Sequence, residues 1–142
     1  MQSMGAPVYM QFVKPVGSAN SHMLCDREDV VRLRELGKKY NADSHLTPHY
    51  ELNVGCLAVK RLVAILASGE VMPCAWTFMS MGNVCDEPLA EILDKGMRYY
   101  GKNVHHCRLL ESEKFRANAV PALTGDALPL MENVMRPGDA DC

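Results

Sequence analysis

The stretch RLVAILASGEVMPC, residues 61–74, predicts a β-hairpin that brings a cysteine to a fixed place. Its two apolar runs, RLVAIL and VMP, are rich in β-branched residues, and Ala-Ser-Gly-Glu separates them. We expect Leu66 to pair with Val71 across a four-residue turn in which Gly69 takes the positive φ. The hairpin would then set the position of Cys74, which follows directly after its second strand.

Six cysteines raise the question of what Cys74 meets. They stand at positions 25, 56, 74, 85, 107 and 142. No two are spaced as C-x2-C, so a metal site would have to be assembled from distant segments. In a reducing compartment clustered thiols favour metal or redox chemistry over disulfides, and independent buried free cysteines are the alternative.

The predicted register separates Cys74 from Cys56. Cys74 lies opposite Val63, seven residues from Cys56, which is roughly 23 Å of straight strand at about 3.3 Å per residue. A disulfide tolerates only about 4.4 to 6.8 Å between Cα atoms. The chain must therefore curl between Gly55 and Lys60 if the two thiols meet. A metal cluster relaxes the demand, because its cysteines bond to different irons.

The segments before the hairpin predict a strand and a helix. Residues 7–16, PVYMQFVKPV, are typical of a buried strand that ends in a loop. Asp26 is a good N-cap for a helix over residues 27–40, in which Val30, Leu33, Leu36 and Tyr40 recur at helical spacing. A strand followed by an amphipathic helix is half of a β/α unit. Residues 41–54 are expected to form a connection.

The segments after the hairpin predict a further turn and helices. Gly82-Asn83 is expected to be a second turn, and Asp86 to cap a helix that runs through Tyr100 and stops at Gly101. The run LLESEKFRANAV, residues 109–120, predicts a short third helix. The tail from Pro121 is rich in proline and glycine, so we expect little regular structure there.

The segment GCLAVKRLVAILASGEVMPCAWTFMSMGNV, residues 55–84, resembles the SPASM or twitch auxiliary-cluster domain of radical S-adenosylmethionine (SAM) enzymes. The family pattern is a cysteine, nine to fifteen residues, glycine, four residues and cysteine; Cys56, Gly69 and Cys74 fit it with twelve and four. The GN dipeptide, EPLAEIL, a later cysteine at Cys107 and the pair Leu128-Pro129 continue the match. The preceding strand and helix look like the end of the radical SAM barrel.

The resemblance implies a fold, a cofactor and a function. It implies an α+β chain, with the last unit of a partial (β/α) barrel in residues 1–50 and the auxiliary domain in residues 51–142. It implies an auxiliary [4Fe-4S] cluster on Cys56, Cys74 and Cys107 that helps to bind substrate or relays electrons in an oxidoreductase or maturase. Lys14 would lie where the last barrel strand passes near SAM.

Two departures limit the resemblance. The family's C-x2-C-x5-C-x3-C second half is missing, which favours the single-cluster twitch form and leaves the fourth ligand open between Cys25, Cys85, Cys142, a non-cysteine group and an open iron. The C-x3-C-x2-C loop of the SAM-cleaving cluster is also missing. We therefore expect the chain to be inactive alone and to work with a barrel half, an electron donor and a peptide or small-metabolite substrate.

Composition narrows the classes of function. With 15 Lys and Arg against 17 Asp and Glu, the net charge of -2 offers no broad basic surface for nucleic acid. No segment has the length and hydropathy of a signal peptide or a membrane span, so we expect a cytoplasmic protein. The alternative function, from a different class, is a zinc-binding or metal-free protein-interaction module without a redox role.

Overall fold

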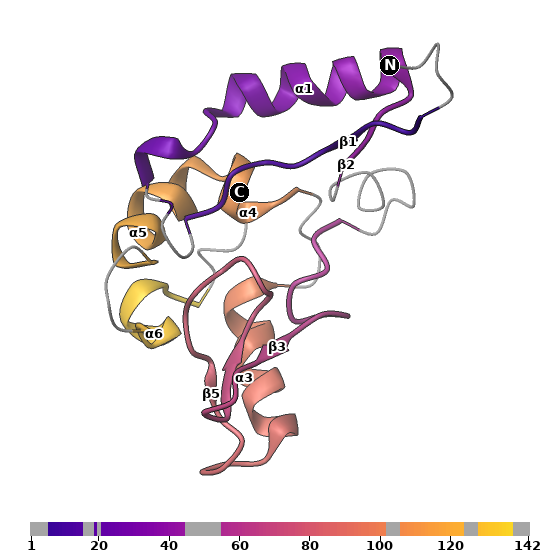
Figure 1. Ribbon diagram of the computed structural model, residues 1–142. Helices are drawn as coiled ribbons and strands as arrows, with labels where there is room; N and C mark the ends of the chain where they lie inside the picture. The colour runs from indigo at the N-terminus through magenta and orange to yellow at the C-terminus, as the bar shows by residue number, and fades with distance from the viewer. Residues whose placement is uncertain are drawn as a thin grey trace.

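The computed structural model describes residues 6–15, 19, 21–44, 55–101, 106–123 and 128–137. The architecture is mixed, with helices and two small sheets, as the predicted α+β class requires (Figure 1). The expected domain boundary between residues 50 and 51 lies outside the described residues.

The N-terminal part is a β-α-β arrangement. Strand β1, Tyr9–Met10, pairs in parallel with β2, Asp43–Ser44, so that Tyr9 faces Asp43. Between them the chain forms the 3-10 helix η2, Ser21–Met23, and helix α1, Arg27–Tyr40. The predicted strand over residues 7–16 is regular only in β1, and Val16 lies outside the described residues. Strand β2 lies in the segment that was expected to be a connection. Its pairing with β1 makes a parallel two-stranded sheet.

Helix α1 begins and ends as its sequence predicts. The Asp26 carboxylate accepts a hydrogen bond from the Asp29 backbone N–H at 2.8 Å, and Asn41 ends the helix with φ 50°. Its predicted apolar face is only partly covered, because Val30 is fully buried whereas Leu36 and Tyr40 are 37 % and 51 % exposed. The C-terminal half of α1 therefore leaves apolar side chains at the surface.

The hairpin forms, but one residue out of the predicted register. Strand β3, Ala64–Ile65, pairs with β4, Glu70–Met72, and the observed partners are Ile65 and Val71. The Leu66 N–H bonds the Glu70 carbonyl, which shortens the turn to three residues. Gly69 does take a positive φ, 88°. A three-residue loop that ends in a left-handed glycine forms a β-bulge. Glu70, which the predicted four-residue turn placed in the loop, is therefore the first residue of β4.

The Gly82-Asn83 dipeptide is a strand rather than a turn. It forms β5, Gly82–Asn83, which pairs antiparallel with β4. The Asn83 side chain donates to the Ser68 carbonyl at 3.0 Å and to the Glu70 carboxylate at 3.2 Å, and accepts from the Cys85 N–H at 2.9 Å. Asn83 therefore holds the hairpin turn against its own strand, and the chain turns only after it.

Helix α3, Leu89–Tyr100, follows that turn. Its N-cap is Pro88 and not Asp86, because the Glu91 and Ile92 N–H groups bond the Pro88 carbonyl. Gly101 ends the helix as predicted, with φ 64°. A Cβ at Gly96 would come within 2.4 Å of the Met81 sulfur and 3.0 Å of Val59. This glycine lets α3 pack closely on the hairpin layer.

The C-terminal segments are more helical than predicted. The expected third helix is two helices, α4, Arg108–Glu111, and α5, Glu113–Leu123. Ser112 separates them, and its hydroxyl accepts the Phe115 N–H at 3.2 Å, as an N-cap does. Helix α5 runs past Pro121, and α6, Met131–Val134, forms in the tail that was expected to be irregular.

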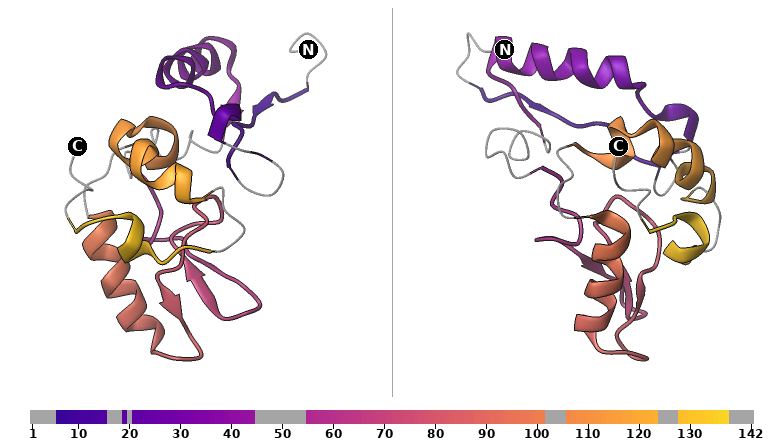
Figure 2. Two further views of the ribbon diagram at one scale, coloured as in Figure 1. Left: turned by 90° about the vertical axis from the view of Figure 1, so that its left-hand side faces the viewer. Right: turned by 180° about the vertical axis from the view of Figure 1, so that it is seen from behind.

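The elements stack in the same order in all three views. The β-α-β part and the sheet of β3, β4 and β5 with α3 lie at opposite ends, and α4 and α5 lie between them (Figures 1 and 2). Hydrogen bonds of Ser80 to Pro129 and Met131 fix the segment before α6 on the strand layer. None of the helices in the described residues is long and apolar enough to cross a membrane.

Candidate metal centre

Three cysteines from distant segments border one cavity of about 240 Å³. They are Cys56, Cys74 and Cys107, the same three that the sequence singles out. Cys56 is buried, and the other two are half-buried. A volume of this size equals a cube about 6 Å on edge, and residues from all three cysteine-bearing segments line it.

Cys56 reaches the cavity because the chain curls directly after it. The Val59 N–H donates to the Pro73 carbonyl at 3.0 Å and to the Leu62 carbonyl at 2.8 Å. Val59 itself has φ 63°, a conformation that β-branched residues rarely adopt. The predicted curl between Gly55 and Lys60 is thus observed, and it places the residues around Val59 beside the strand that ends at Cys74.

Cys74 lies in a tight turn at the end of the hairpin. The Thr77 N–H bonds the Cys74 carbonyl at 3.3 Å, and the two residues form an antiparallel bridge. The Cys74 sulfur accepts the Trp76 N–H at 3.4 Å and lies 3.3 Å from the Thr77 hydroxyl oxygen. The hairpin therefore fixes this sulfur with two polar contacts.

Cys107 is the N-cap of α4 and packs against both hydrophobic clusters of the chain. Its own N–H donates to the Glu111 carboxylate at 3.1 Å. The other oxygen of that carboxylate pairs with Arg34 of α1. The segment that carries Cys107 is in this way tied to the N-terminal helix.

Burial makes the thiols of the cavity hard to ionise. It raises the pKa of Cys107 to about 12 and also raises the pKa of Cys56, and in each case the neighbouring cysteines add to the rise. Backbone N–H groups act in the opposite direction, because Ala58 and Leu110 hydrogen-bond the sulfurs of Cys56 and Cys107. With the Trp76 contact of Cys74, each of the three sulfurs receives a backbone hydrogen bond from two or three residues further on.

Two cations line the same cavity. Lys14 is 5 % exposed, and its amino group lies 4.6 Å from the centre of the Trp76 ring. Arg108 is 2 % exposed and donates to the Tyr100 carbonyl at 2.7 Å. Burial lowers the pKa of Lys14 to about 8, while the charges of Cys107 and Cys74 raise it. Positive charge in a buried pocket favours an anionic occupant.

The remaining cysteines lie elsewhere. Cys25 packs with Phe12 and Val30, and Cys85 is exposed beside the hairpin turn; neither lines the cavity. Cys142 lies outside the described residues. All five cysteines within the described ranges are free thiols. In the same ranges no group of three His, Cys, Asp or Glu residues is arranged to hold a metal ion.

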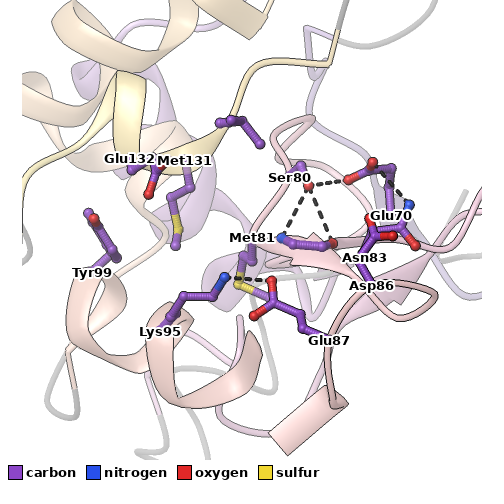
Figure 3. Close-up of a pocket in the computed structure, with 12 residues that line it drawn as sticks. Glu70, Ser80, Met81, Asn83, Asp86, Glu87, Lys95, Tyr99, Met131 and Glu132 are labelled. Atoms are coloured by element: carbon purple, nitrogen blue, oxygen red, sulfur yellow. Dashed lines mark hydrogen bonds and ion pairs between the residues drawn. The ribbon is translucent and has the colours of Figure 1, made fainter. Parts of the chain in front are cut away.

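A second cavity, of about 230 Å³, is lined by residues of β4, β5, α3 and α6 (Figure 3). Glu70 accepts the Ser80 hydroxyl and the Asn83 amide, and Lys95 pairs with Glu87 at 2.6 Å. These contacts join β4 to β5 and α3 to the segment before it. The acidic residues Glu70 and Glu87 thus have structural partners within this part of the chain.

Sequence reasoning missed three residues that line the cysteine cavity. Lys14 was expected near SAM, yet it lies with the cysteines. Tyr100 was taken only as part of the apolar face of its helix, and Arg108 was not singled out. Adjacency to Cys107 is the one signal in the sequence that points to Arg108.

Comparison with known proteins identifies the segment that holds these cysteines. Residues 56–119 match the family model of SPASM, an iron-sulfur cluster-binding domain. No curated protein and no solved structure matches the chain significantly. The match begins at Cys56 and includes Cys74 and Cys107. Residues 56–119 are therefore similar to SPASM iron-sulfur cluster-binding domains, which is consistent with the auxiliary-domain resemblance that the cysteine spacing indicates.

Proposed function

We propose that Cys56, Cys74 and Cys107 hold an auxiliary [4Fe-4S] cluster in a radical SAM oxidoreductase or maturase. The observation that carries the proposal is that these three cysteines, 51 positions apart between the first and the last, border one cavity. A cluster supplies one-electron transfer or an iron that binds substrate. The protein supplies the thiolates, the charge balance and the exclusion of water.

The cavity suits a cluster better than a single ion. A zinc ion needs its ligands at about 2.0 to 2.3 Å from one point, whereas a [4Fe-4S] cluster bonds each thiolate to a different iron. The three cysteines line a space of about 240 Å³, which is larger than a single ion fills. Their backbone hydrogen bonds are of the kind that tunes sulfur ligands of such clusters.

The two cations complete the fit. A thiolate-ligated cluster is anionic, and Lys14 and Arg108 bring positive charge to the same cavity. Metal binding must displace the protons of the buried thiols, and the charge of Arg108 already lowers the pKa of Cys56. Trp76, which is 37 % exposed, lies at the cavity with the Lys14 amino group over its ring and limits the access of water.

The proposal requires three protein thiolates and no more. Cys25 and Cys85 do not line the cavity, so we propose that the fourth iron is open or takes a non-cysteine ligand or Cys142, which lies outside the described residues. SAM cleavage would occur on a separate barrel that bears the C-x3-C-x2-C motif, with an electron donor and a peptide or small metabolite as substrate. Exposed Tyr9, Leu36 and Tyr40 on the β-α-β part support packing against further barrel strands. A cytoplasmic location would keep the thiols reduced.

Anaerobic reconstitution with iron and sulfide tests the proposal. Cys56→Ala, Cys74→Ala and Cys107→Ala should each lose most of the bound iron, because a cluster deprived of one of three thiolates is poorly held. Cys25→Ala and Cys85→Ala are the matched controls and should retain it. The measurements are iron and sulfide content, visible charge-transfer absorption and the electron paramagnetic resonance spectrum of the reduced protein.

Three results would contradict the proposal or its ligand set. A colourless protein that takes up zinc in place of iron would favour the zinc-binding module, and one that takes up neither would favour the metal-free module. Iron retained by Cys107→Ala at the level of the parent would remove Cys107 from the ligand set. With SAM and a strong reductant, the loaded chain alone should form no 5′-deoxyadenosine above a control without protein.

A further inference from the structure

Tyr100 is held rigidly at the edge of the cysteine cavity. It is the last residue of α3, is 2 % exposed and lines the cavity with the three cysteines. Its ring meets Phe115 edge-on, with ring centres 6.3 Å apart. The Arg108 guanidinium carbon lies 5.0 Å from the centre of the Tyr100 ring. These contacts fix the direction in which the hydroxyl group points.

The Tyr100 hydroxyl lacks a hydrogen bond of normal geometry although it is buried. The Thr77 hydroxyl is near enough to lower the pKa of Tyr100 slightly, but that hydroxyl is engaged with the Cys74 sulfur at 3.3 Å. Burial raises the pKa of Tyr100 well above 10, and the charges of Cys74 and Cys56 raise it further. The group is therefore a neutral O–H donor close to two of the three sulfurs.

A buried hydroxyl without a partner is unfavourable, and most such groups in native proteins are satisfied. The three cysteines that line the same cavity offer sulfur acceptors beside the Thr77 hydroxyl. A cluster would bring further sulfurs, each carrying more negative charge than a protonated thiol. A filled cavity would therefore offer Tyr100 a more strongly accepting partner than the empty one does.

We propose that the Tyr100 hydroxyl donates a hydrogen bond to a sulfur of the cluster held by Cys56, Cys74 and Cys107, and so raises its reduction potential. The inference rests on the proposed function. Reduction adds one negative charge to the cluster, and a hydrogen bond donor stabilises the more negative state more strongly. Tyr100 is thus a positioning residue that tunes electron affinity, and it is not a ligand.

The test compares Tyr100→Phe with Tyr99→Phe in the reconstituted full chain. Tyr99 is adjacent in sequence but lines the second cavity and not the cysteine cavity. Redox titration should show Tyr100→Phe with about a tenfold lower ratio of reduced to oxidised cluster at a given potential, equal to a shift of 59 mV for one electron. Tyr99→Phe should match the parent.

The cluster-free proteins give a second readout that does not need the cluster. Phenylalanine keeps the contacts with Phe115 and Arg108 and removes an unsatisfied group, so apo Tyr100→Phe should be at least as stable to urea as the apo parent. An unchanged potential, or an equal loss of stability in the apo and loaded proteins, would overturn the inference and indicate a bond to Thr77 instead. A parent that binds no cluster would overturn the proposed function itself.

Discussion

The carboxylate of Glu111 connects the candidate metal centre to the N-terminal helix, and its removal has a predictable cost. One oxygen pairs with Arg34 and the other accepts the Cys107 N–H. The side chains of Glu111 and Arg34 are 8 % and 28 % exposed. Glu111→Ala would leave a half-buried guanidinium and a backbone N–H without this acceptor. We expect lower stability and weaker retention of the cluster.

The magnitude follows from the burial of the pair. Breaking a fully buried pair by removing one partner costs about 3 to 5 kcal/mol, whereas an exposed pair contributes about 0 to 1 kcal/mol. This pair lies between the two limits, so Glu111→Ala should lower the free energy of unfolding by about 2 kcal/mol. At roughly 3 °C per kcal/mol for a chain of this size, Tm should fall by about 6 °C. Glu111→Gln keeps one acceptor and should cost about half as much.

Urea unfolding of the apo protein measures these costs. A double-mutant cycle with Arg34→Met and Glu111→Gln should give a coupling energy of about 1 kcal/mol. The Lys95 and Glu87 pair is the matched control, because its side chains are 36 % and 27 % exposed and Glu87→Gln should cost less than about 1 kcal/mol. A Glu111→Ala cost no larger than that of the control would refute the view that this carboxylate joins the two parts of the chain.

Three further predictions concern the hairpin, pH and the loss of metal. Gly69→Ala should destabilise the protein by about 1 to 3 kcal/mol, because its φ is 88° and a Cβ would lie 2.3 Å from the Asn83 side-chain oxygen; Ser68→Ala is the control, and an equal effect in urea unfolding would contradict this account. Burial raises the pKa of Cys107 from 9.0 to about 12 in the folded apo protein. Between these pH values the unfolded chain loses the thiol proton while the folded protein keeps it. The contribution of this thiol to the free energy of unfolding is therefore full below pH 9 and is lost as the pH rises toward 12. Lys14 has the opposite trend, because its lowered pKa of about 8 makes stability rise as the pH increases from 8 to 10.5. Comparison of the parent with Cys107→Ala separates the two trends. Parallel stability curves for parent and variant would contradict the prediction for Cys107. Removal of the cluster should reduce protection from hydrogen exchange in the described part of residues 55–110 and also in residues 6–15, which carry Lys14; unchanged exchange throughout would favour the metal-free module.

Sequence patterns predicted the elements whose signals are local. The Asp26 cap, the length of α1, the left-handed Gly69 and the stop at Gly101 all follow from interactions within a few residues. The predictions were wrong where a distant partner decides. Gly82-Asn83 has the composition of a turn, yet it becomes a strand because β4 offers it a free edge.

The helix boundaries in the C-terminal part are likewise decided by distant partners and not by local sequence signals. Pro121 predicted the end of regular structure, but α5 continues to Leu123, a buried residue of the main hydrophobic cluster. Ser80 captures the later segment by bonding Pro129 and Met131. Burial and pairing across the chain outweigh the local preference of proline, and neither is visible in a window of neighbouring residues.

The sequence by itself predicted an iron-sulfur cluster-binding domain and its candidate cysteine ligands. The spacing of Cys56, Gly69 and Cys74 and the later Cys107 marked an iron-sulfur domain, and residues 56–119 match that family. Only the tertiary structure decided how the cysteines meet and what surrounds them. The positive φ of Val59 curls the chain, and Lys14 arrives from a segment more than forty residues before Cys56. The spacing of the cysteines gives only their order along the chain. The charge and the hydrogen bonds in the cavity depend on which distant side chains the packing brings to it.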